Sequence, residues 1–227
     1  MAKNTVLIDL NKCTGCRGCQ VACKSWHQQK AVKTEFFKDA NLQNPPLDSQ
    51  DYYTLVKFKE VMIKGKVRWF FRKHQCMHCR EAPCVKVCPL KAIEVSPAGY
   101  SWIVPEKCDG CGVCVDVCPF DVIKKFDTPG KGVKCDKCDF CHKRLELSLA
   151  PACVTSCSTE AMTFGERADQ LELAGRIIKL FPKLRLYGKN QMGGLGFFYI
   201  YEGNPDYYDL PADPTPITPF INMFRAS

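Results

Sequence analysis

The sequence predicts an α+β fold of two small cysteine-rich modules, built from short hairpins and short helices, with an extended C-terminal arm. Seventeen of the 227 residues are cysteine, and this odd number argues against a complete set of disulfides. Most of the cysteines fall into four runs. The first cysteines of the later runs lie 32 residues apart (76 to 108) and then 30 residues apart (108 to 138). This internal repeat of strand, cysteine loop, short helix and strand predicts four units that form two modules.

The third run indicates what the cysteines bind. Cys108, Cys111, Cys114 and Cys118 are followed by Pro119, in the C-x2-C-x2-C-x3-C-P spacing of bacterial ferredoxins. Three such thiolates hold one [4Fe–4S] cluster, and the fourth ligates a different cluster. A zinc site more often uses two C-x2-C pairs set well apart. The run therefore predicts iron–sulfur clusters and requires partner runs.

Three further runs supply these partners. The first has the same spacing, with Lys24 in place of the final proline, and the second has a longer loop that contains Pro83. The fourth holds five cysteines. We expect Cys135 not to be a ligand, although a register that starts at Cys135 and leaves Cys141 idle stays open. The cysteines of these runs are Cys13, Cys16, Cys19 and Cys23; Cys76, Cys79, Cys84 and Cys88; and Cys138, Cys141, Cys153 and Cys157, beside Cys135.

Short strands and one longer helix connect the runs. Residues 4–10 predict a strand that leads into the first run, and a helix is expected between Gly165 and Pro182 with Leu171, Ala174, Ile178 and Phe181 on one face. Alternating patterns around turn residues predict three hairpins. Their strands are 54–63 with 67–71, 93–95 with 102–104, and 122–126 with 132–134.

The C-terminal part changes in character. Residues 205–219 hold five prolines, which exclude a helix or a central strand. Aromatic residues such as Tyr207 and Tyr208 lie among them, whereas a disordered tail is poor in aromatics. We therefore expect an extended arm that lies on another subunit.

Charge and hydropathy exclude several classes of protein. The formal charge of +8 suggests nucleic acid, but four [4Fe–4S] sites with their thiolates carry about −8 and bring the sum close to zero. A basic zinc-binding nucleic-acid module is therefore disfavoured. The sequence predicts no secretory signal and no transmembrane segment. We expect a cytoplasmic location, with periplasmic export on a partner's signal as the alternative.

Four such runs, with the longest gap after the first, resemble the iron–sulfur (beta) subunits of molybdenum or tungsten bis-pterin oxidoreductases. Several segments look most like formate dehydrogenase beta subunits. They are residues 13–26 (CTGCRGCQVACKSW), 43–46 (QNPP), 75–79 (QCMHC) and 187–189 (YGK) followed by Gly193 and Gly194. The resemblance implies an electron-transfer subunit of an anaerobic oxidoreductase complex, not the catalyst itself. Its partners would be a Mo/W-bis-pterin catalytic subunit, which oxidises formate or reduces carbon dioxide, and a further redox subunit or soluble carrier. An equivalent subunit of another Mo/W oxidoreductase and a free polyferredoxin are the alternatives.

The resemblance also implies how the runs pair. The first run would combine with the fourth, and the second with the third, in two bacterial-ferredoxin-like modules with two [4Fe–4S] clusters each. Residues 1–75 with 127–181 would form the first module, 76–126 an inserted second module, and 182–227 a C-terminal extension docked on a partner subunit. The implied ligand sets are Cys13, Cys16, Cys19 and Cys157; Cys23, Cys138, Cys141 and Cys153; Cys76, Cys79, Cys84 and Cys118; and Cys88, Cys108, Cys111 and Cys114.

Overall fold

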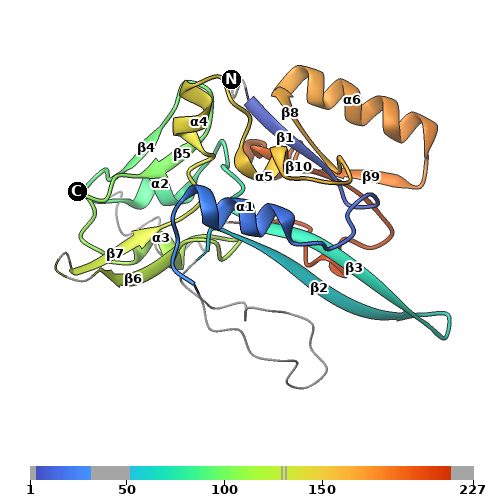
Figure 1. Cartoon of the computed structure of the whole chain (residues 1–227), viewed down its shortest axis with the longest axis horizontal. Coiled ribbons are helices and arrows are strands. Elements are labelled where there is room, and N and C mark those ends of the chain that lie inside the picture. Colours follow the sequence, from blue (N-terminus) through green and yellow to red (C-terminus); the bar gives the residue numbers. More distant parts are fainter. Residues whose placement is uncertain (1–3, 32–51, 129, 131, 216–227) are drawn as a thin grey trace.

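A four-stranded sheet forms one side of the molecule (Figure 1). The computed structural model describes residues 4–31, 52–128, 130 and 132–215. The strands of the sheet lie in the order β8 (Met162–Glu166), β1 (Asn4–Asp9), β10 (Phe197–Glu202) and β9 (Leu184–Tyr187). The central strand β1 runs parallel to β10 and antiparallel to β8, and β10 runs antiparallel to β9.

The two faces of this sheet pack against different partners. Side chains alternate between the faces of a strand, so Phe198 and Ile200 of β10 face helix α6 (Arg167–Leu180), whereas Phe197 and Tyr199 face the cysteine-rich interior. All four of these side chains are buried, with at most 1% of their surface exposed. The sheet therefore joins an ordinary apolar layer on one side to the cysteine loops on the other.

Helix α6 (Arg167–Leu180) confirms the helix expected after Gly165. Leu171, Ala174 and Ile178 pack against the sheet, but Phe181 is 61% exposed. Phe181 leaves the predicted face because the helix ends at Leu180, one residue before it. Among the residues that the structure describes, no helix is long and apolar enough to cross a bilayer.

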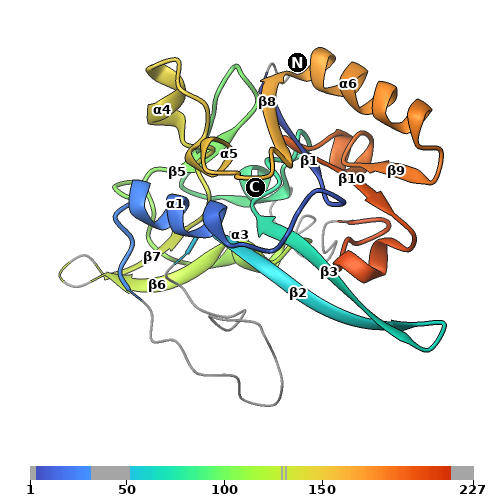
Figure 2. The same ribbon diagram turned by 45° about the vertical axis from the view of Figure 1, so that its right-hand side comes forward.

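Three hairpins surround the cysteine loops. The pair β2 (Thr54–Ile63) and β3 (Lys66–Gln75) is the longest and protrudes from the body beside the four-stranded sheet (Figure 2). The shorter pairs are β4 (Ile93–Val95) with β5 (Ser101–Ile103), and β6 (Lys124–Thr128) with β7 (Gly132–Asp136). All three hairpins occur where the sequence predicts them.

Each cysteine run includes a short helix, and the four helices begin in the same way. In each helix the second residue is the third cysteine of its run, namely Cys19, Cys84, Cys114 or Cys153. Helix α1 packs on α5, and α2 packs on α3, so the first and fourth runs meet, as do the second and third. These helices are α1 (Gly18–Trp26), α2 (Pro83–Val87), α3 (Val113–Asp116) and α5 (Ala152–Thr155), and α4 (His142–Glu146) follows the fourth run's first loop.

The segment after residue 182 differs from the separate extension that we expected. Strands β9 and β10 belong to the main sheet, with a 3-10 turn (Gln191–Gly193) between them. A second 3-10 turn (Pro205–Tyr208) packs on the β2–β3 hairpin, where Tyr207 and Tyr208 lie 5.0 and 5.1 Å from the Phe70 ring. Residues 184–211 therefore pack on their own chain, and docking on a partner stays a prediction. Residues 216–227 of the predicted arm lie outside the described residues.

The loop of the third run depends on a close approach of two backbones. Gly110 has a φ of +75°, and a Cβ there would lie 2.3 Å from the carbonyl oxygen of Val133 in β7. Gly65, in the β2–β3 turn, has a nearly equal φ of +74° but nothing within 4 Å of its Cβ position. Both glycines have a positive φ, but only at Gly110 would a side chain also collide with a neighbouring backbone. The two positions therefore form a matched pair for mutation.

We expect Gly110→Ala to lower the free energy of unfolding by roughly 2–5 kcal/mol, because conformational strain and overpacking add. Gly65→Ala should cost only ~1–2 kcal/mol, from the strain alone. Anaerobic urea titration of the two variants measures the difference. Equal losses of stability would show that the contact between Gly110 and Val133 is not required.

Candidate metal centres

All seventeen cysteines lie in the described part of the chain, and all are free thiols. Sixteen of them gather in four groups of four, in which each group combines three cysteines of one run with one cysteine of another. Group I is Cys13, Cys16, Cys19 and Cys157; group II is Cys23, Cys138, Cys141 and Cys153; group III is Cys76, Cys79, Cys84 and Cys118; and group IV is Cys88, Cys108, Cys111 and Cys114.

Groups I and II are built where α1 and α5 meet. Burial raises the pKa of Cys13, and the nearby thiols of Cys157 and Cys16 raise it further. In group II, burial raises the pKa of Cys141 to about 12, with additional repulsion from Cys153 and Cys23. These mutual effects mean that cysteines more than 100 residues apart in sequence are electrostatic neighbours.

Groups III and IV line two small cavities beside α2 and α3. Cys76, Cys79, Cys84 and Cys118 line the first cavity. Burial raises the pKa of Cys79, and the other three thiols of its group raise it further. The four group IV cysteines line the second cavity, together with Cys135.

The chemistry of these groups fits [4Fe–4S] clusters. Each group offers four thiols, the number that such a cluster requires. Backbone N–H groups point at several of the sulfurs: Ala92 N–H donates to Cys88 Sγ at 3.3 Å, and Phe140 N–H to Cys138 Sγ at 3.4 Å. Hydrogen bonds of this kind are among the factors that set the reduction potential of a cluster. Burial raises the pKa of the Cys19 thiol to about 12 and that of Cys23 to about 11, so metal binding must displace protons here.

Neighbouring groups follow one another in a single series. Cys153 of group II raises the pKa of Cys19 of group I, after the larger effect of burial. Cys76 of group III acts in the same way on Cys138 of group II. Cys84 of group III is also a neighbour of Cys114 of group IV. The order in space is therefore I, II, III, IV.

A buried lysine lies at each of the first two junctions, and sequence reasoning missed both. Lys73 is 2% exposed and its ammonium donates to Thr54 Oγ1 at 3.2 Å. Burial acts to lower its pKa, but the thiolates of Cys153 and Cys19, followed by those of Cys138 and Cys23, raise it more. Lys73 thus places one positive charge between groups I and II.

Lys137 holds the corresponding place between groups II and III. Its Nζ lies 2.6 Å from the carbonyl oxygen of Ser101, 3.3 Å from that of Cys138 and 3.6 Å from Cys76 Sγ. The side chain is 1% exposed. Burial acts to lower the pKa of Lys137, and nearby cysteine thiolates raise it above its ordinary value. Its position directly before Cys138 is the one signal in the sequence that could have identified it.

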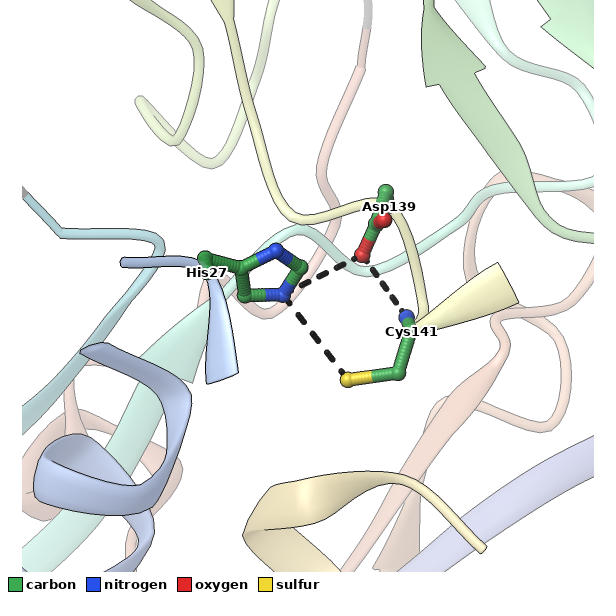
Figure 3. A group of neighbouring side chains, drawn as sticks. All are labelled: His27, Asp139 and Cys141. Atoms are coloured by element: carbon green, nitrogen blue, oxygen red, sulfur yellow. Dashed lines mark hydrogen bonds and ion pairs between the residues drawn. The ribbon is translucent and has the colours of Figure 1, made fainter. Parts of the chain in front are cut away.

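A polar cluster supports group II from the outside (Figure 3). His27 Nε2 faces Asp139 Oδ1 at 3.4 Å and Cys141 Sγ at 3.8 Å, while Cys141 N–H donates to Asp139 Oδ1 at 2.7 Å. His142 Nδ1 lies 2.9 Å from the other oxygen of the same carboxylate. Because Cys141 belongs to group II, this polar cluster of side chains can orient the Cys141 thiol and place an N–H beside its sulfur.

The structure places every cysteine predicted as a ligand in the group that the predicted pairing implies, and ligation of iron stays a prediction. We expected Cys135 not to be a ligand, but its surroundings are not those of an isolated cysteine. It is 3% exposed and lies among the group IV cysteines. Sequence spacing assigned Cys135 to the fourth run and gave no sign of this neighbourhood.

Comparisons with known proteins agree with this chemistry. Residues 12–92 and 67–167 match two family descriptions, each a 4Fe-4S dicluster domain. The iron-sulfur subunit of a nitrate-inducible formate dehydrogenase of Escherichia coli is 34% identical over 221 residues, which cover 92% of this chain and 72% of that subunit. A formate dehydrogenase subunit beta of Megalodesulfovibrio gigas is 35% identical over 74% of this chain and 78% of its own length. The formate dehydrogenase 2 subunit beta (cytochrome c-553) of Nitratidesulfovibrio vulgaris is 34% identical over 89% of this chain and 95% of its own length.

We expect Lys137→Met to lower the reduction potentials of the centres at groups II and III, because the variant lacks the positive charge that stabilises an added electron. The shift should be on the order of 100 mV for a unit charge several ångströms away at an effective dielectric constant of about 20. Redox titration followed by electron paramagnetic resonance measures it. Lys179→Met, on the exposed side of α6, serves as the control and should leave all potentials unchanged. Equal potentials in the two variants would contradict this role of Lys137.

Proposed function

This chain belongs to the family of formate dehydrogenase iron–sulfur subunits, and we propose that it relays electrons through four [4Fe–4S] clusters between a catalytic subunit and a further acceptor or donor. Members of this family are electron-transfer subunits and not catalytic ones. The observation that carries the proposal is the continuous series of four thiol groups inside one chain. Bound clusters supply one-electron uptake and release.

Sixteen cysteines are the proposed iron ligands, and group membership defines the four sites. Support comes from the four free thiols in each group and from the backbone N–H donors to sulfur. The fourth cysteine of each run joins the group of another run, which is the arrangement of two-cluster ferredoxins. We assign sites I to IV to the groups of the same number, and Cys135 is not a ligand in this assignment.

The same grouping supports a chain of two modules. Sites I and II use the first and fourth runs, and sites III and IV use the second and third. The module at 76–126 is thus proposed to be inserted into a discontinuous module of 1–75 and 127–181. The packing of α1 on α5 and of α2 on α3 favours this division.

The two ends of the series are proposed as the places where electrons enter and leave. Only two of the seventeen cysteines, all of them described, are exposed: Cys16 of site I and Cys111 of site IV. These sites stand first and last in the order. Sites II and III hold only buried or half-buried thiols, so a docked redox partner comes nearest to a centre at sites I and IV.

The chain's own residues prepare these sites for negatively charged clusters. Lys73 compensates charge at the junction of sites I and II, and Lys137 does so at the junction of sites II and III, where both side chains are buried from water. The exposed Lys125 donates to the carbonyl oxygen of Cys111 at 3.4 Å and adds positive charge at the outer end. We propose that the catalytic partner acts on formate or carbon dioxide, since the related subunits are named as parts of formate dehydrogenases. That this partner carries a molybdenum or tungsten bis-pterin centre is proposed from the resemblance of the sequence motifs.

Anaerobic isolation of the chain with its bound partners tests the function as a whole. We expect about sixteen irons per chain, stoichiometric molybdenum or tungsten, and formate-dependent reduction of an artificial dye. Sixteen irons in a chain that elutes alone would instead indicate a free polyferredoxin. Zinc without iron would contradict the assignment of the sites.

A pair of variants tests the ligand assignment in the fourth run. Cys141→Ser should lose one cluster, about four irons, because Cys141 belongs to group II, whereas the register that starts at Cys135 leaves Cys141 idle. Cys135→Ser should keep about sixteen. Iron analysis and electron paramagnetic resonance of the anaerobic protein distinguish the two, and the opposite result would move the register of the fourth run to Cys135.

A further inference from the structure

Site IV contains a fifth thiol that the sixteen-ligand assignment does not use. Cys135 lies on β7, is 3% exposed, and lines the same cavity as the four group IV cysteines. Its backbone N–H donates to Cys108 Sγ at 3.4 Å. The chain has seventeen cysteines, so sites I to III, with four each, have no such additional thiol.

The sulfur of Cys135 is held by the loop of the third run itself. It makes side-chain hydrogen bonds with Cys114 and Cys108, and it accepts the backbone N–H of Gly112. The third run's own Cys111 accepts a backbone N–H in the same way, from Val113. Cys135 therefore occupies the position of a ligand-like sulfur, although it comes from a strand outside the run.

We propose that Cys135 is a spare iron ligand at site IV, able to replace Cys114 when that bond to iron is lost; this rests on the proposed [4Fe–4S] cluster at that site. In the exchange, the iron–sulfur bond to Cys114 breaks and one to Cys135 forms. The proton of the Cys135 thiol passes to the departing Cys114 thiolate, with which it already shares a hydrogen bond. No electron is gained or lost, so no oxidant or reductant is needed.

The location of site IV gives the exchange a purpose. Site IV stands at one end of the series and includes the exposed Cys111, so solvent and small oxidants reach it more readily than the inner sites. Cys135 is buried behind that exposed edge. A spare thiol at this place keeps iron in the site during temporary loss of one ligand.

Two matched alanine variants test the proposal. Cys114→Ala removes the neighbour of Cys135 at site IV, and Cys19→Ala removes the cysteine at the equivalent helix position of site I, which has no fifth thiol. We expect Cys114→Ala to keep about sixteen irons and a four-iron signal at site IV in electron paramagnetic resonance. Cys19→Ala should lose one iron, with a three-iron signal, or the whole cluster.

The double variant Cys114→Ala/Cys135→Ala should lose iron as Cys19→Ala does. If Cys114→Ala alone has the iron content and the spectrum of the double variant, Cys135 is not a spare ligand. Cys108→Ala, which removes the other thiol in contact with Cys135, repeats the test should Cys114→Ala fail to fold. The parent chain is measured beside them: fewer than four clusters there would overturn the proposed function itself, whereas four clusters with a failed rescue would overturn the spare ligand alone.

Discussion

A positive charge inside a protein is stable only beside groups that compensate it, and this constraint organises the interior of the chain. The ammonium groups of Lys73 and Lys137 are buried among cysteine sulfurs, with hydroxyl or carbonyl oxygens as their other partners. Each lysine also joins elements from different parts of the sequence. Lys73 connects β3 to β2 through Thr54, and Lys137 connects the fourth run to β5 through Ser101. The thiol groups, the hairpins and the two lysines therefore depend on one another.

The local parts of this arrangement could be predicted from sequence, because their signals span only a few residues. The spacing C-x2-C-x2-C-x3-C determines that a loop ends in a short helix, and the structure places the third cysteine of every run at the second position of such a helix. Turn residues such as Gly65 and Gly99, both with positive φ, identified the hairpins. The α+β class and the presence of two 4Fe-4S dicluster domains follow from these local patterns.

Contacts between distant residues could not be predicted in this way. Strand β10 (FFYIYE) is buried on both faces beside β1, and such an apolar run has no alternation that would reveal a strand. The prolines after residue 205 correctly excluded a long helix, but composition does not say which surface an irregular segment covers. For that reason we expected a separate extension where the chain completes its own sheet. Cys135, His27 and Lys137 likewise each contact residues that are distant in sequence, so no local motif marks these contacts.

The central place of β1 has a consequence for how the protein is made. Residues 4–9 are synthesised long before the strands that pair with both edges of β1, which are β8 at 162–166 and β10 at 197–202. Until then this apolar segment has unpaired edges, which are templates for aggregation. Sites I and II wait in the same way for Cys153 and Cys157, whereas the cysteines of sites III and IV are complete by residue 118. The proposed module at 76–126 can thus be complete before Cys153, Cys157 and β10 are synthesised, whereas sites I and II and the four-stranded sheet must wait for them.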